Sequence, residues 1–142
     1  MSQENVELWR TAIEDFLAIT SESEWEGWIA RTAETWDREI EWDASGFNVP
    51  GVTGIYRGKE AVKEFWREWL GAWETSKFDY ELLDAGDRVV VLLDQTMRGR
   101  STGIEVGTGS YAQIATFKDG LMVRWKVYPS QSKALEAAGL SE

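Results

Sequence analysis

The chain has 142 residues, of which 43% are hydrophobic, and this predicts one domain spanning residues 1–142 with a substantial hydrophobic core. A net charge of -10 repels phosphate backbones, so we expect no nucleic-acid partner. The lack of cysteine and histidine excludes thiolate catalysis and removes the commonest zinc ligands, so we expect no metal. Any acid–base chemistry must therefore use Asp, Glu, Tyr or Lys.

No apolar run approaches the roughly 20 residues that a membrane-spanning helix needs, so we expect no membrane partner. The N-terminal residues lack the basic and apolar regions of a secretory signal. The cysteine-free composition is compatible with a reducing compartment, and we expect a cytoplasmic protein.

Apolar residues at helical spacing predict three helices in the first half of the chain, over residues 3–19, from residue 23 to about residue 37, and over residues 59–76. Ser23 and Glu26 fit a capping box at the start of the second helix. Between the second and third helices, alternation over residues 39–43 predicts a short strand, which a glycine-rich loop follows.

Beyond residue 77 the apolar pattern changes to that of strands, predicted near residues 78–82, 88–97, 104–117 and 121–128, with a short closing helix at 132–138. The order α-α-β-α-β-β-β-β predicts an α+β fold in which helices cover one face of a curved antiparallel sheet. The natural cavity of such a fold lies between the helices and the concave face of the sheet.

Nine tryptophans allow two interpretations, large core residues or the walls of a cavity for an apolar ligand. Trp66, Trp69 and Trp73 share one stripe of the third predicted helix. A core role is favoured for this stripe, although its edge can also line a cavity.

Several segments, in this order along the chain, resemble SnoaL-like proteins of the NTF2-like superfamily: the opening helix and residues 41–43, 54–62, 84–91, 117–120 and 125–128. The resemblance covers nearly the whole chain. It implies a cone-shaped, strongly curved mixed or antiparallel sheet packed on three helices, which encloses a pocket, and a homodimer formed through the sheet. The superfamily includes ketosteroid isomerases, polyketide cyclases, epoxide hydrolases and dehydratases, but also non-catalytic domains, so fold alone does not fix the function.

The resemblance to ketosteroid isomerases aligns their proton-shuttling Asp with Asp43, at the end of the first predicted strand. It aligns the two members of their oxyanion hole with Phe16, which has no hydroxyl, and with Gln113, which can still donate a hydrogen bond. Asp43 also has simpler interpretations, because it could form an Asx-turn at the loop or be solvated.

The catalytic set of limonene-type epoxide hydrolases aligns with Asp94, Thr96 and Val127, which retain one acid, so we reject that mechanism. Residues two apart in a strand share a face, and we expect Asp94 and Thr96 on the concave face, with Tyr111 as the favoured partner of Asp94. If this face is convex instead, Asp94 would lie at a dimer interface or in water.

The leading hypothesis is a pocket protein for a small apolar molecule. As an enzyme it would be a cofactor-free isomerase, cyclase or hydratase acting on an apolar carbonyl compound, with Asp43 and Asp94 as candidate catalytic residues. The alternative is a non-catalytic ligand-binding or dimerising module with a degenerate pocket. The candidate substrate-binding residues are Phe16, Trp42, Tyr56, Trp66, Trp69, Tyr111, Gln113, Trp125 and Val127.

Overall fold

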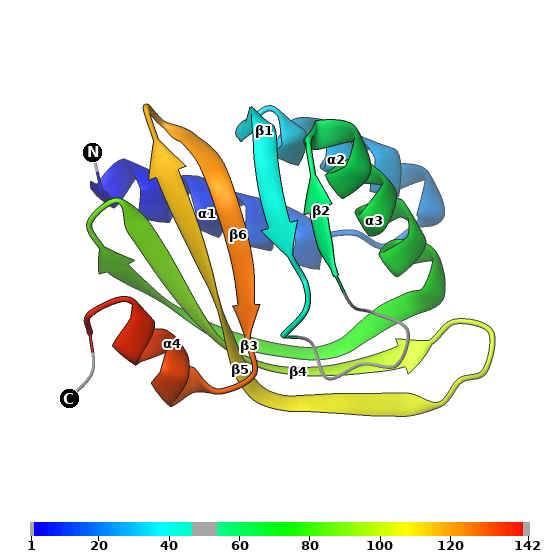
Figure 1. Ribbon diagram of the computed structural model, residues 1–142. Helices are drawn as coiled ribbons and strands as arrows, with labels where there is room; N and C mark the ends of the chain where they lie inside the picture. The colour runs from blue at the N-terminus through cyan, green and yellow to red at the C-terminus, as the bar shows by residue number, and fades with distance from the viewer. Residues whose placement is uncertain (1, 47–53, 141–142) are drawn as a thin grey trace.

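A computed structural model describes residues 2–46 and 54–140 of the chain (Figure 1). The helices are α1 (Ser2–Leu17), the 3-10 helix η1 (Glu22–Glu24), α2 (Trp25–Ala33), α3 (Lys59–Ala72) and α4 (Gln131–Ala137). The strands are β1 (Trp36–Asp43), β2 (Ile55–Arg57), β3 (Trp73–Ala85), β4 (Arg88–Gly99), β5 (Glu105–Lys118) and β6 (Leu121–Tyr128). The predicted α+β fold is confirmed.

The strands form one sheet in the order β2-β1-β6-β5-β4-β3. The last four strands pair antiparallel with their sequence neighbours, as expected of a meander. Only the contact between β1 and β6 is parallel, within the described part of the chain. The sheet curls strongly around α1, α2 and α3, while α4 packs on its outer side (Figure 1).

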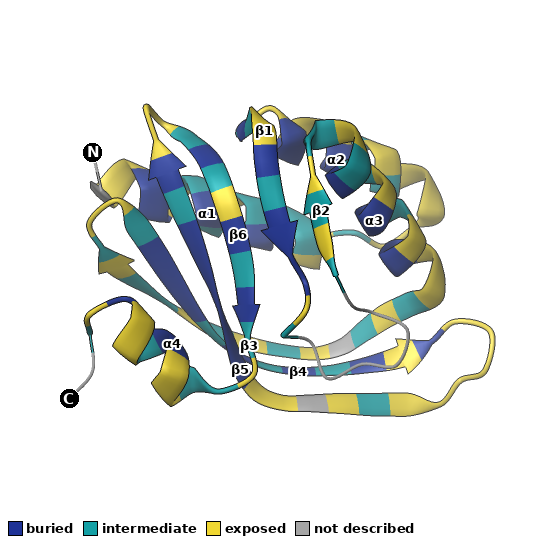
Figure 2. Cartoon of the chain, in the orientation of Figure 1, coloured by how far each residue is buried: buried dark blue, intermediate teal, exposed yellow. Residues whose placement is uncertain are grey.

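The first half of β4 is apolar on both faces, and each face packs on different elements. Val89, Val91 and Leu93 belong to the inner core, which the helices α1 to α3 cover. Val90 and Leu92 alternate with them and join the smaller outer core beneath α4. Most of β4 is therefore buried, whereas exposed residues gather on the outer sides of the helices and in the first half of β5 (Figure 2).

Three predicted element boundaries were wrong. The second helix ends at Ala33, so Trp36 begins β1 instead of extending the helix. The third helix ends at Ala72, because the next residues pair in register with the end of β4, and this ladder outweighs helix propensity. The capping box lies two residues earlier than predicted, since the Glu24 carboxylate accepts from the N–H of Ser21 at 3.2 Å.

The turn after β1 packs tightly on the end of β6. A Cβ atom added at Gly46 would lie 2.2 Å from the carbonyl oxygen of Val127, so no side chain fits there. The Ala44 N–H donates to the Gly54 oxygen at 2.9 Å, which joins the two described ends of the predicted glycine-rich loop. Residues 47–53 of that loop lie outside the described residues.

Candidate functional site

A cavity of about 60 Å³ lies between the helices and the concave face of the sheet. Its walls come from α1, α2, α3 and the inner faces of β1 and of β3 to β6. The described residues that line it are mostly aromatic or aliphatic: Leu8, Trp9, Ala12, Ile13, Phe16, Trp28, Thr32, Thr35, Trp36, Trp66, Trp69, Phe78, Val91, Leu93, Gln95, Tyr111, Gln113, Met122 and Trp125. None of these side chains carries a charge at neutral pH.

Trp125 of β6 is the centre of the aromatic packing at this site. Its ring stacks on that of Trp66 from α3, with ring centroids 5.4 Å apart. The ring of Trp9 from α1 meets it edge-on at 6.1 Å, and Trp42 of β1 lies 4.4 Å away. Because rings from two helices and from the neighbouring strand β1 converge on this side chain of β6, Trp125 fixes the helices against the sheet.

A line of hydrogen-bonded polar side chains, here called the polar seam, crosses the concave face from β6 to β3. The Trp125 indole N–H donates to Gln113 Oε1 at 2.8 Å, and the Tyr111 hydroxyl donates to Gln95 Oε1 at 2.6 Å. The Gln95 amide in turn donates to the Thr75 hydroxyl oxygen at 3.2 Å. Buried polar groups are costly without partners, so these bonds let an otherwise apolar floor carry polar atoms.

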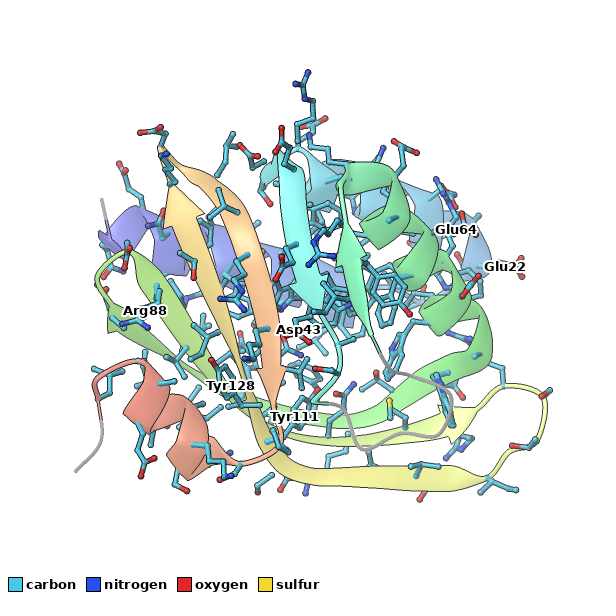
Figure 3. The ribbon with its side chains drawn as sticks, in the orientation of Figure 1. Glu22, Asp43, Glu64, Arg88, Tyr111 and Tyr128 are labelled. Carbon is cyan, nitrogen blue, oxygen red and sulfur yellow. The ribbon has the colours of Figure 1, made fainter. Side chains whose placement is uncertain are left out.

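Burial raises the pKa of Tyr111, and a hydrogen bond from the Gln113 side chain opposes that rise. The Tyr111 hydroxyl therefore stays protonated at neutral pH and is a hydrogen-bond donor, not a base. Figure 3 labels Tyr111 on β5, and α4 also packs against this strand.

Two tryptophans that line the cavity contribute further donors. The indole nitrogens of Trp36 and Trp66 are buried and have no hydrogen-bond partner among the described residues. A buried donor without a partner costs about 1–3 kcal/mol, a cost that an acceptor atom on a bound molecule would remove. Both nitrogens are donors without a described partner inside the aromatic packing around the cavity.

Six of the nine predicted substrate-binding residues line the cavity: Phe16, Trp66, Trp69, Tyr111, Gln113 and Trp125. The other three belong to the packing around it. Trp42 lies behind Trp66 and Trp125, and Tyr56 of β2 packs on Phe65 with ring centroids 5.0 Å apart. Val127 is 1% exposed within the inner core.

The predicted position of Asp94 on the concave face was wrong. Asp94 lies on the outer face of β4, where its side chain is 47% exposed and 4.0 Å from the Lys77 ammonium. The Tyr111 hydroxyl, predicted as its partner, bonds Gln95 instead. The inner face of β4 carries the alternate set of residues, because that set packs against the helices.

Asp43 is 5% exposed, at the end of β1 (Figure 3). Its Oδ1 atom accepts from the Ser45 N–H at 3.0 Å and from the Ser45 hydroxyl at 2.5 Å. This is the Asx-turn that the sequence left open as one interpretation. Asp43 follows Trp42, whose ring lies in the inner core, so by strand alternation its carboxylate lies on the opposite face of β1.

Sequence reasoning missed Gln95 and Thr75 of the polar seam, and it missed Trp36 because that residue was placed on a helix. The residues before Asp94 in this strand are apolar on both faces, so the hydrophobic pattern leading up to Gln95 has no clear period. A weaker signal was available, because Arg88, Asp94 and Arg98 all fall on one face of this strand. Three charges on one face indicate solvent, which leaves Gln95 on the buried face.

The described part of the chain contains neither a cluster of metal-binding side chains nor a helix that could span a membrane. No three carboxylates gather there as a metal ion would require. No helix of residues 2–46 and 54–140 is long and apolar enough to cross a membrane.

These features define a class of protein: an α+β domain whose curled sheet and three helices enclose a small apolar cavity with a polar floor. A family model of the SnoaL-like domain matches residues 13–125, and the chain belongs to this SnoaL-like family. A comparison with curated protein sequences found no match.

Crystal structures of three bacterial proteins share the fold. An NTF2-like protein from Burkholderia xenovorans LB400 superposes with a TM-score of 0.70 at 23% identity, covering 90% of each chain. A candidate isomerase from Bacillus subtilis gives 0.67 at 19% identity, covering 98% of this chain and 95% of that one. A candidate polyketide cyclase from Xanthomonas campestris gives 0.67 at 13% identity, covering 96% and 98%. At such identities the likeness shows the fold alone.

Proposed function

We propose that this protein binds an uncharged, largely apolar small molecule, and that an end of the molecule bearing an oxygen acceptor occupies the cavity. The observation that carries the proposal is the lining: aromatic walls, a floor of neutral hydrogen-bonding groups, and no charged side chain among the described lining residues. A charged group buried there would have no counter-ion, which costs several kcal/mol.

The donors of the site support an oxygen acceptor on the ligand. Trp36 and Trp66 have buried N–H groups without partners in the described residues. The Tyr111 hydroxyl stays neutral because burial raises its pKa, and its hydrogen is donated to Gln95, so it contributes to the uncharged floor and not as an unused donor. A carbonyl or ether oxygen accepts such hydrogen bonds, while a hydrocarbon leaves them unmade.

A matched pair of probes tests this proposal. Acetophenone and ethylbenzene have nearly the same shape, and only acetophenone carries a carbonyl oxygen. We expect acetophenone to bind about five- to tenfold more tightly, the effect of one net hydrogen bond. The shifts of the tryptophan indole N–H signals in ¹H–¹⁵N NMR titrations measure both affinities.

Two variants make the same chemical change on opposite faces of the sheet. Tyr111→Phe removes a hydroxyl from the polar seam, and Tyr128→Phe removes one from a residue packed on the outer core. We expect the preference for acetophenone to fall in Tyr111→Phe and to persist in Tyr128→Phe. Equal binding of the two probes to the unmodified protein, or no binding of either, contradicts the proposal.

A cofactor-free isomerase, cyclase or hydratase acting on an apolar carbonyl compound is the second candidate. The burial of Asp43 favours it, because a buried carboxylate is a plausible general base, and two structural neighbours are named as a candidate isomerase and a candidate cyclase. Because the Asp43 carboxylate lies on the face of β1 opposite the cavity, this mechanism requires it to leave Ser45 and turn toward the ligand before it removes a proton next to the carbonyl. Its test is Asp43→Asn: unchanged turnover of a verified substrate eliminates Asp43 as the base.

A further inference from the structure

A second hollow, here called the cleft, lies beside the cavity and is larger, at about 440 Å³. It runs between the end of α1, the start of α2, the end of α3 and the start of β3. The described residues that line it are Phe16, Leu17, Ile19, Thr20, Ser21, Glu22, Trp25, Leu70, Trp73, Glu74, Thr75 and Arg100. Unlike the cavity, the cleft combines aromatic faces with hydroxyl and charged groups.

Phe16 separates the two spaces, as it is the only described residue that lines both. On the cavity side its ring contacts those of Trp28 and Phe78, with centroids 5.4 Å and 5.9 Å away. The polar seam crosses the same boundary, because Gln95 lines the cavity and its partner Thr75 lines the cleft. One aromatic side chain is thus a partition whose rotation would join the cavity to the cleft.

The size of the cavity requires such a connection. Pockets that hold whole ligands commonly measure about 300–1,000 Å³, and the cavity offers about 60 Å³. A molecule large enough to be recognised therefore has only one end in the cavity. The cleft is the neighbouring space, bordered by the same Phe16 side chain, and at about 440 Å³ it can hold the rest.

The charges of the cleft restrict what that outer end can be. Glu22 and Glu74 contribute two carboxylates to the described lining, of which Glu74 pairs with Arg98 at 3.6 Å, against the single guanidinium of Arg100. Arg100 is already engaged: its Nε donates to the Leu70 oxygen at 2.6 Å, and its guanidinium carbon lies 4.8 Å from the centre of the Trp25 ring. With a net charge of -10 on the whole chain, an anionic group is disfavoured there.

We propose that the cavity and the cleft are two chambers of one binding site, gated by Phe16, for an elongated molecule with an apolar, acceptor-bearing inner end and an uncharged polar outer end. The inference rests on the proposed function, since it requires a ligand in the cavity. It adds the shape and charge of that ligand and the residue that controls its entry.

The charge rule, by which we mean that the cleft disfavours an anionic outer end, is tested with two fluorescent probes that share the same ring skeleton. N-phenyl-1-naphthylamine is neutral, and 8-anilinonaphthalene-1-sulfonate carries a sulfonate on the same pair of ring systems. We expect the neutral probe to bind about tenfold more tightly at low salt, and acetophenone to displace it. The double substitution Glu22→Gln with Glu74→Gln should narrow this difference. Equal affinity for the two probes overturns the charge rule.

Variants of Phe16 test the gate by stopped-flow fluorescence. We expect Phe16→Ala to accelerate association of the neutral probe at least fivefold and Phe16→Trp to slow it. Phe117→Ala is the matched control, because Phe117 is a buried aromatic of the inner core that lines neither space among the described residues. Should Phe16→Ala fold poorly, Phe16→Leu provides the same test with less loss of packing.

The outcomes separate the two proposals. If acetophenone binds but the association rate of the neutral probe is the same in the Phe16 variants as in the Phe117 control, the gate is wrong and the cavity proposal stands. If acetophenone does not displace the neutral probe, the two chambers are not one site. If no neutral probe shifts the indole signals at all, the proposed function itself fails.

Discussion

Gln95 and Asp94 are neighbours on β4, yet their side chains lie in opposite environments. Gln95 faces inward, is 4% exposed and exchanges hydrogen bonds with Tyr111 and Thr75. Asp94 faces outward, with its side chain 47% exposed and only a 4.0 Å pair with Lys77. On the inner face polar groups are neutral and paired with one another, whereas on the outer face they are charged and solvated. The difference predicts that equivalent substitutions on the two faces have very different effects.

The largest difference should come from the aromatic side chains. Trp125→Ala removes the ring on which Trp9, Trp42 and Trp66 converge, so we expect a loss of about 3–5 kcal/mol in the free energy of unfolding. Tyr128→Ala, three residues later and packed on the outer core, should cost clearly less. Urea denaturation of the two variants measures both values, and similar losses would contradict the central position of Trp125.

The polar seam should be sensitive to losing a single member. Gln113→Leu leaves the buried indole N–H of Trp125 without its acceptor, and we expect a loss of about 1–3 kcal/mol in unfolding free energy. The double variant with Trp125→Phe removes the donor as well. A double-mutant cycle should then show positive coupling between the two positions, and simple additivity would mean that this bond contributes nothing.

At alkaline pH the raised pKa of Tyr111 should make the free energy of unfolding depend on pH, which a tyrosine with an unshifted pKa would not do. Burial holds the pKa of Tyr111 above the value of about 10 that it has in the unfolded chain. The stabilising effect of keeping it protonated is therefore complete below about pH 10. Above that pH the Tyr111 hydroxyl ionises in the unfolded chain but not in the folded protein, so the free energy of unfolding falls by up to about 1.4 kcal/mol per pH unit.

Tyr111→Phe should make the unfolding free energy fall less steeply above about pH 10 than in the unmodified protein. Denaturation curves at several alkaline pH values test this, and the absorbance of ionised tyrosine in the folded protein gives a second measure. If the variant and the unmodified protein lose stability in parallel, the pKa of Tyr111 is not raised by folding.

The smallest effect is expected on the outer face. Asp94→Asn removes a charge from a half-exposed pair, so we expect a change within about 0.5 kcal/mol and no change in the binding of acetophenone. Gln95→Leu, the neighbouring substitution on the inner face, should cost more because it leaves the Tyr111 hydroxyl without this acceptor. A large change in the affinity for acetophenone in Asp94→Asn would mean that Asp94 does take part in the binding site.

The sequence by itself determined the order and type of the elements except β2, which lies in the stretch predicted as a glycine-rich loop. Helical spacing located α1 to α3, alternation located the long strands, and the ordered motifs indicated the SnoaL-like fold that the family match and the superposed structures confirm. Six of the nine candidate lining residues could be named for the same reason, since a known fold tells which elements border its cavity. The errors at Ser23 and Trp36 were errors of boundary, where local signals for neighbouring elements overlap.

Only the tertiary structure decided which face of each element meets the cavity. The stretch 89–93 of β4 is apolar on both faces, because α4 covers one and the N-terminal helices cover the other, so alternation within it could not assign Asp94 and Gln95 to a face. The polar seam, the Asx-turn at Asp43 and the partition at Phe16 each join residues from different parts of the folded chain or depend on local hydrogen bonds. Periodicity in sequence records which residues share a face, whereas packing against other elements determines what that face contacts.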